Sequence, residues 1–144
     1  MSIRLESGET LAYTKLILAT GTRVRPLPTG GCELPNLYSL RTLDDVKSIR
    51  SNLDTVKKLL IIGAGYIGLE LAASAVKKGI QLTVLESIDR VLDRVTCAVV
   101  SELYRDMHDN EGVDLRFNLV IDRFKKSTDE TSVILGEGLS IYFD

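Results

Sequence analysis

The sequence predicts an α/β fold in which helices flank a parallel sheet and a small antiparallel β appendage follows. Apolar runs typical of strands alternate with segments of helical periodicity; in chain order these are residues 57–62, 66–78, 81–86, 96–110 and 113–117. Two more strand-like pieces, 132–135 and 139–143, surround a turn and predict the appendage. With 144 residues, the chain is long enough for one compact domain with its own core.

The N-terminal part predicts a short ribbon followed by a linker. Residues 2–5 and 10–19 are strand-like and surround a turn. A two-stranded ribbon cannot bury both of its faces alone, so residues 1–21 resemble the end of another unit. Residues 22–38 contain all 3 prolines and predict an extended linker.

A helix is expected directly after this linker. Thr42 is a suitable N-cap, and Asp45 follows three residues later, as in a capping box. The apolar face of this helix is expected to consist of Leu43, Val46, Ile49 and Leu53.

The next segment carries the most informative motif of the chain. The unbroken apolar run 57–62 predicts a strand buried on both faces. Gly63, Gly65 and Gly68 follow it as Gly-x-Gly-x-x-Gly. The first glycine permits a tight turn, the second allows the backbone to approach a pyrophosphate, and the third lets the helix pack on the sheet. The N-terminus of that helix offers free N–H groups to an anion.

The helix and strand after the turn complete a dinucleotide-binding pattern. The helix 66–78 places Ile67, Leu71 and Ala75 on one face and ends at two lysines and a glycine. The strand 81–86 ends at Glu86, where a carboxylate can accept hydrogen bonds from both ribose hydroxyls. The pattern indicates a Rossmann-like βαβ dinucleotide-binding domain. The alternative is a parallel βαβ unit whose turn happens to contain glycines.

The remaining elements are predicted from their periodicity. An irregular connection, 87–95, leads to the helix 96–110, and residues 120–125 are expected to extend the strand 113–117. The apolar stripe of the helix is expected to be Val99, Val100, Leu103, Tyr104 and Met107. His108, the only histidine, falls on the polar side of the helix and is expected to be solvated.

Composition excludes several classes of function. The net charge is −2 and basic residues are scattered, so neither nucleic acid nor a membrane surface is expected as a partner. No apolar run approaches the roughly 18–20 residues that span a bilayer, and the first ten residues have no signal-peptide core, so a cytoplasmic protein is expected. Cys32 and Cys97 match no metal or redox spacing, and we expect no metal site and no catalytic side chain.

Four motifs in order resemble the pyridine nucleotide-disulfide oxidoreductase superfamily, and within it the FAD-dependent ferredoxin, rubredoxin and putidaredoxin reductases. They are LAYTKLILATG at 11–21, LRTLDD at 40–45, IGAGYIGLE at 62–70, and VLE at 84–86 with RVL at 90–92. The resemblance implies that residues 1–21 are the closing strands of a FAD domain otherwise outside the chain. Residues 22–38 would be the linker, and 39–144 a NAD(H)-binding domain truncated at its C-terminus.

The resemblance also assigns roles to residues. It implies that the glycine turn holds the pyrophosphate of a nicotinamide dinucleotide, because the 19–21 turn of the flavin side precedes it. Tyr66 matches an aromatic residue between nicotinamide and flavin, with simple packing as an equal alternative, and Glu70 matches an acid near the nicotinamide amide, with a solvated carboxylate as the alternative. The cofactor-binding residues expected are Gly63, Gly65, Tyr66, Ile67, Gly68, Glu70, Glu86 and Arg90.

Glu86 favours NADH over NADPH. A 2′-phosphate within ~4–5 Å of this carboxylate would be repelled by roughly 3–4 kcal/mol at an effective dielectric near 20. Arg90 leaves some use of NADPH open, because it can lie beside the adenosine.

The function implied is that of an NADH-binding domain that positions nicotinamide for hydride transfer to FAD. Electrons would then pass to a ferredoxin-, iron–sulfur or rubredoxin-type carrier, and the domain alone would be inactive. Two alternatives are a stand-alone NAD(H)-binding or sensing module and a remnant whose glycine turn is empty.

Overall fold

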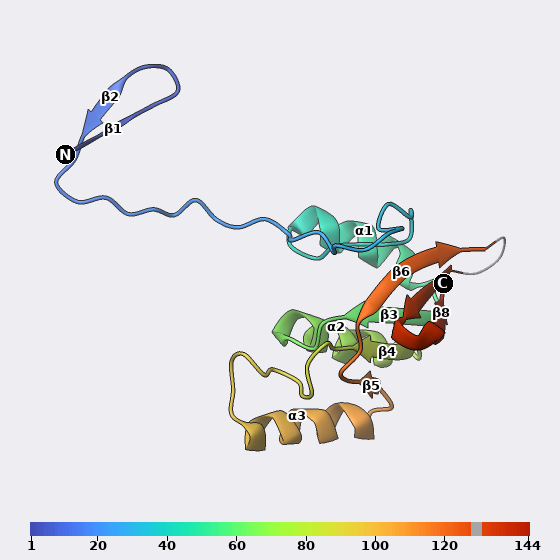
Figure 1. The fold of residues 1–144 in the computed structure, drawn as a ribbon. Coiled ribbons are helices and arrows are strands. Elements are labelled where there is room, and N and C mark those ends of the chain that lie inside the picture. Colours follow the sequence, from blue (N-terminus) through green and yellow to red (C-terminus); the bar gives the residue numbers. More distant parts are fainter. Residues whose placement is uncertain (128–130) are drawn as a thin grey trace.

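The computed structural model describes residues 1–127 and 131–144, apart from the side chain of residue 137. It contains three small sheets and three α-helices (Figure 1). The described parts form an α/β fold with a parallel sheet, flanking helices and antiparallel strands, as the sequence predicts.

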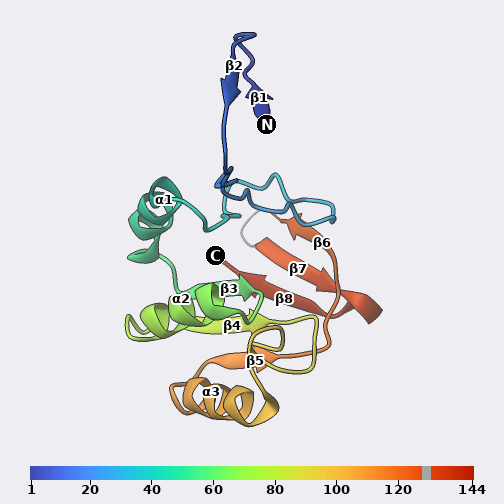
Figure 2. The same ribbon diagram turned by 90° about the vertical axis from the view of Figure 1, so that its left-hand side faces the viewer.

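The parallel sheet is the centre of the fold. Its strands are β3 (Lys58–Ile62), β4 (Gln81–Leu85) and β5 (Asp114–Arg116), in the order β3-β4-β5. Helices α2 (Tyr66–Val76) and α3 (Ala98–Asn110) pack on these strands (Figure 2). Alternate side chains of β4 face different cores: Val84 belongs to the core beneath the helices, and Leu85 to the core on the other face.

A separate antiparallel sheet covers that other face. It consists of β6 (Ile121–Lys126), β7 (Thr131–Leu135) and β8 (Ser140–Phe143), and a short 3-10 turn, η1 (Gly136–Gly138), joins the last two. The predicted appendage is therefore confirmed. The expectation that 120–125 extends the third parallel strand is wrong, because Asn118 has a positive φ of 57° and the chain leaves the parallel sheet there.

Helix α1 (Leu43–Leu53) begins as predicted but is not buried. Thr42 and Asp45 form the expected capping box, and the Thr42 backbone N–H lowers the pKa of the Asp45 carboxyl. The predicted apolar face of α1 reaches the core only at its C-terminal end, where the partly buried Leu53 packs against it; no residue of the helix is fully buried, and Leu43 is 69% exposed.

The N-terminal ribbon is shorter than expected and stands away from the rest of the chain (Figure 1). It pairs β1 (Ser2–Arg4) with β2 (Thr10–Ala12), although a strand was expected as far as residue 19. Ile17 and Leu18 are strongly exposed. Strand propensity alone does not extend β2, since β1 offers it only a short pairing partner.

Strand β3 is an edge strand and not, as expected, buried on both faces. Of its residues only Ile61 is buried, and Ile62 is 38% exposed. The parallel ladder turns the peptide groups of Lys58, Leu60 and Ile62 away from β4. At that outer edge, Asp144 bonds to both backbone groups of Lys58. Its carboxylate accepts from the Lys58 N–H, and its own N–H donates to the Lys58 carbonyl.

Helix α3 contacts the core through Tyr104 of the predicted stripe and also through residues that the sequence did not indicate. The predicted stripe is largely exposed, with Val99 at 76% and Leu103 at 57%, whereas Ser101 and His108 are buried. The expectation of a solvated His108 is wrong. Its Nδ1 lies 2.8 Å from the Tyr104 carbonyl oxygen, and its Nε2 lies 3.1 Å from that of Leu69 in α2.

Replacing His108 by leucine should lower the stability of the fold, because the link between the backbones of α3 and α2 is lost. We expect His108→Leu to reduce the free energy of unfolding by about 1–3 kcal/mol, measured by urea denaturation followed by circular dichroism. Asp106→Asn, on an exposed position of the same helix, should change it by no more than about 0.5 kcal/mol. Equal effects of both substitutions would contradict a structural role for the histidine.

Candidate functional site: a glycine turn closed by a carboxylate

The glycine turn lies where β3 ends and α2 begins. Gly63 has a φ of 101°, a left-handed conformation that favours glycine, and its N–H donates to the Leu85 carbonyl at 2.8 Å. Gly65 is the extended N-cap of α2. The turn therefore sits at the carboxyl ends of two neighbouring parallel strands, which is where open α/β sheets bind ligands.

Gly68 has different surroundings from Gly63 and Gly65. A Cβ atom on Gly68 would collide with the Gly63 carbonyl oxygen, so only glycine permits this close approach of α2 to the end of β3. A Cβ atom on Gly65 would meet no heavy atom within 4 Å. The space beside Gly65 is open, as the approach of a ligand requires.

The first turn of α2 presents exposed side chains and backbone N–H groups. Tyr66 and Ile67 are 52% and 53% exposed, and Glu70 is exposed as well. The N-cap makes no side-chain hydrogen bond to the helix. Tyr66 and Glu70, four residues apart, lie on one face of the helix.

Glu86 closes the turn from the end of β4. Its Oε2 accepts a hydrogen bond of 2.7 Å from the N–H of Ala64, the residue between the first two glycines. Its Oε1 accepts from the N–H and hydroxyl of Ser87 at 2.7 and 3.1 Å, and from the N–H of Ile88 at 3.3 Å. The sequence pattern placed Glu86 near the turn but did not indicate this direct bond.

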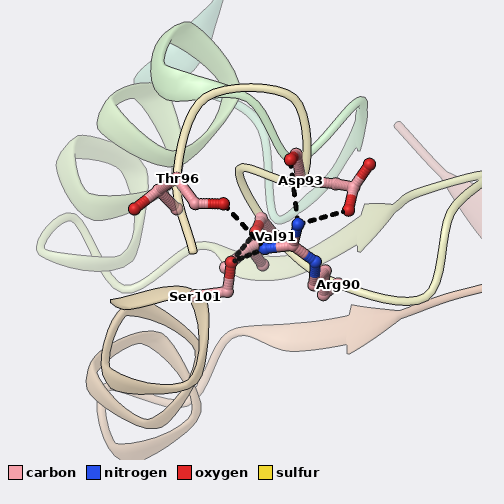
Figure 3. Close-up of polar contacts among 5 residues, drawn as sticks. All are labelled: Arg90, Val91, Asp93, Thr96 and Ser101. Atoms are coloured by element: carbon pink, nitrogen blue, oxygen red, sulfur yellow. Dashed lines mark hydrogen bonds and ion pairs between the residues drawn. The ribbon is translucent and has the colours of Figure 1, made fainter. Parts of the chain in front are cut away.

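Arg90 is engaged within its own loop rather than with the turn (Figure 3). Its guanidinium contacts the Thr96 carbonyl, the Ser101 hydroxyl, and both the carbonyl and the carboxylate of Asp93. The expectation that Arg90 lies beside an adenosine stays a prediction. Nothing in the sequence alone pointed to Ser101, a small polar residue between the apolar residues 98–100 and Glu102 of α3.

A cavity of about 380 Å³ adjoins the turn along the outer edge of β3. Its lining is mainly apolar and includes Leu60, Ile62, Ile67, Gly68 and Phe143. The start of α2 thus borders both the open side of the glycine turn and this cavity.

Other kinds of site find less support. Within residues 1–127 and 131–144 no cluster of histidine, cysteine or acidic side chains could hold a metal ion. Both cysteines are free; Cys97 is exposed at the start of α3, where the Val100 N–H lowers the pKa of its thiol. No helix in the described part of the chain is long and apolar enough to cross a membrane.

Comparison with known proteins agrees with this geometry. The chain is 41% identical to putidaredoxin reductase of Pseudomonas putida over 146 residues, covering 97% of the chain and 35% of that protein. It is 40% identical to rhodocoxin reductase of Rhodococcus erythropolis over 116 residues, covering 81% of the chain and 27% of that protein. The chain thus spans about a third of the length of these relatives.

A solved structure and a protein-family model also match nearly the whole chain. The ferredoxin reductase for the CYP199A2 system of Rhodopseudomonas palustris matches with a TM-score of 0.87 and 34% identity, over 99% of this chain and 36% of that one. The model of the pyridine nucleotide-disulphide oxidoreductase family matches residues 2–144. The chain therefore belongs to the pyridine nucleotide-disulphide oxidoreductase family.

Proposed function

We propose that the chain is the NADH-binding domain of an FAD-dependent reductase of the ferredoxin-reductase type. The observation that carries the proposal is the Glu86 carboxylate, which lies on the open glycine turn at the carboxyl ends of β3 and β4. In the proposed enzyme, nicotinamide delivers a hydride to FAD, and FAD passes electrons to a protein carrier. This chemistry belongs to the cofactors, and the domain contributes binding and orientation.

Each part of the turn has a task in this proposal. The N–H groups at the start of α2 and the open space at Gly65 would receive the pyrophosphate. Glu86 would accept hydrogen bonds from the adenosine ribose in exchange for some of those that its Oε1 accepts from Ser87 and Ile88. Tyr66 and the neighbouring Ile67 would contact the nicotinamide ring. Glu70 would lie near the nicotinamide amide.

The charge of Glu86 supports NADH as the ligand. The carboxylate already receives four hydrogen bonds from the chain, so its position is fixed before a nucleotide arrives. A 2′-phosphate beside it would be repelled by roughly 3–4 kcal/mol at an effective dielectric near 20. The guanidinium of Arg90 is already paired with the Asp93 carboxylate, which reduces what its charge could do against that repulsion.

The rest of the proposal concerns the whole protein. Residues 1–21 would close a FAD domain, 22–38 would link it to the NAD(H)-binding domain, and 39–144 would form that domain in part. The electron acceptor would be an iron–sulfur protein such as a ferredoxin, or a rubredoxin. The names of the relatives support this, because they include putidaredoxin reductase and rubredoxin–NAD(+) reductase. We place the enzyme in the cytoplasm.

A stand-alone NAD(H)-binding or sensing module is the second candidate. Glu86 bonds to the glycine turn without any contact from a flavin domain, and this favours a module that binds NAD(H) alone. Tight NADH binding by the 144-residue chain, without any flavoprotein partner, would support the module over the reductase domain.

The first prediction concerns cofactor choice. Calorimetric titration of the chain should show NADH bound at least about 100-fold more tightly than NADPH, because of the repulsion at Glu86. Glu86→Gln should narrow this ratio, whereas Asp89→Asn, an exposed acid nearby, should leave it unchanged. The assignment fails if neither nucleotide binds or if the unsubstituted chain prefers NADPH.

The second prediction separates the roles of two glycines. Gly68→Ala should lower the free energy of unfolding by about 1–3 kcal/mol, since the new methyl group collides with the Gly63 carbonyl. Gly65→Ala should cost less than about 1 kcal/mol but should weaken NADH binding, because the methyl group fills the space for the pyrophosphate. Gly136→Ala, which also meets no atom within 4 Å, is the matched control. Unchanged NADH affinity in Gly65→Ala would argue against pyrophosphate binding there.

The third prediction concerns activity. The purified 144-residue chain should be colourless and should not reduce ferricyanide with NADH, because the proposed flavin site lies in another domain. Absorbance spectra and a ferricyanide assay test this directly. A bound yellow chromophore would contradict the proposed division of the enzyme.

A further inference from the structure

The backbone of Ala64, within the glycine turn, is hydrogen-bonded on two sides. This residue is only 1% exposed. Its N–H donates to Glu86 at 2.7 Å, and its carbonyl accepts the N–H of Leu92 at 2.9 Å. Both backbone groups at the middle of the turn are therefore fixed by the segment that follows β4.

Leu92 reaches Ala64 from an unusual backbone conformation. Its φ is 54°, in the left-handed region that is unfavourable for a residue with a Cβ. Its carbonyl accepts the N–H groups of Val95 and Thr96 at 3.0 and 3.1 Å, and its side chain is buried. A tight turn over residues 91–96 thus directs the Leu92 N–H towards the glycine turn. Because the Leu92 conformation is unfavourable, other contacts must stabilise this tight turn and hold it in place.

Arg90 provides this hold (Figure 3). One of its terminal nitrogens, Nη1, donates to the Thr96 carbonyl at 3.0 Å and to the Ser101 hydroxyl at 2.8 Å. The other, Nη2, donates to the Asp93 carbonyl at 3.0 Å and lies 2.7 Å from the Asp93 carboxylate. The Ser101 hydroxyl in turn donates to the Val91 carbonyl at 2.7 Å. The guanidinium therefore ties the middle and the end of the tight turn to α3.

We propose that Arg90 is a positioning residue for the dinucleotide turn and does not bind the nucleotide itself. By fixing residues 91–96, it keeps the Leu92 N–H on the Ala64 carbonyl and so keeps the turn in the shape that receives a pyrophosphate. The part of this inference that concerns NADH rests on the proposed function, whereas the hold on the turn does not. A planar fork with several donors is needed, and lysine cannot supply it.

The test compares Arg90→Gln and Arg90→Lys with the control Arg94→Gln, which changes an exposed arginine of the same segment. Hydrogen exchange of the Leu92 amide is measured by NMR in the nucleotide-free chain, relative to the amide of Val84 in the core of β4. Both Arg90 variants should raise this ratio about tenfold or more and weaken NADH binding by a similar factor, the size expected for lost hydrogen bonds to a charged group. The control should match the unsubstituted chain.

Three results would overturn the proposal. The first is an unchanged Leu92 exchange ratio in Arg90→Gln. The second is an equal rise at Leu92 and Val84, which would mean global destabilisation only. The third is recovery of NADH affinity in Arg90→Lys, which would assign Arg90 a plain charge beside the nucleotide.

If the Arg90 variants do not fold, Ser101→Ala takes their place, since it removes one of the four contacts of Arg90 together with the bond from the Ser101 hydroxyl to the Val91 carbonyl, and it should raise the Leu92 ratio a few-fold. An unchanged ratio in that variant also overturns the proposal. If the Leu92 exchange ratio rises in a chain that binds no NADH, Arg90 positions the turn but the proposed function is wrong. Failure of this inference can therefore be distinguished from failure of the proposed function.

Discussion

The short bond from the Ala64 N–H to the Glu86 carboxylate joins the end of β3 to the end of β4. The shape of the glycine turn, the entry of α2 and the position of the acid all depend on it. A carboxylate suits this place because all four groups that contact it are hydrogen-bond donors. A glutamine would have to turn its amide group towards some of those donors, so the charge that would select the nucleotide is also what the local structure requires.

Helix α2 connects this site with the remainder of the core. Its first turn borders the glycines. The carbonyl oxygen of Leu69, also in α2, lies 3.1 Å from Nε2 of His108 in α3. Buried alanines, Ala72 and Ala75, let the helix lie close to the sheet. The rigid side of the site thus comes from packing, whereas the side that would face the proposed nucleotide carries the exposed Tyr66 and Ile67.

Features that depend on neighbouring residues in the sequence were predictable. The glycine spacing, the Thr42 cap and a strand that leads directly to Glu86 follow from local chemistry, and the structure contains each of them, with β4 ending at Leu85 rather than at Glu86. Features that depend on distant partners were not. His108 is buried because Leu69, 39 residues away in the chain, offers a carbonyl, and periodicity along α3 carries no information about that carbonyl. The bond of Leu92 to Ala64 escaped prediction for the same reason.

The outer edge of β3 has a consequence for handling the protein. Asp144 covers Lys58, while the peptide groups of Leu60 and Ile62 face an apolar cavity. An uncovered strand edge beside apolar side chains can template pairing with any extended segment, including the same strand of another molecule. Any such pairing between two copies of this chain would increase with protein concentration, so dilute conditions would disfavour it.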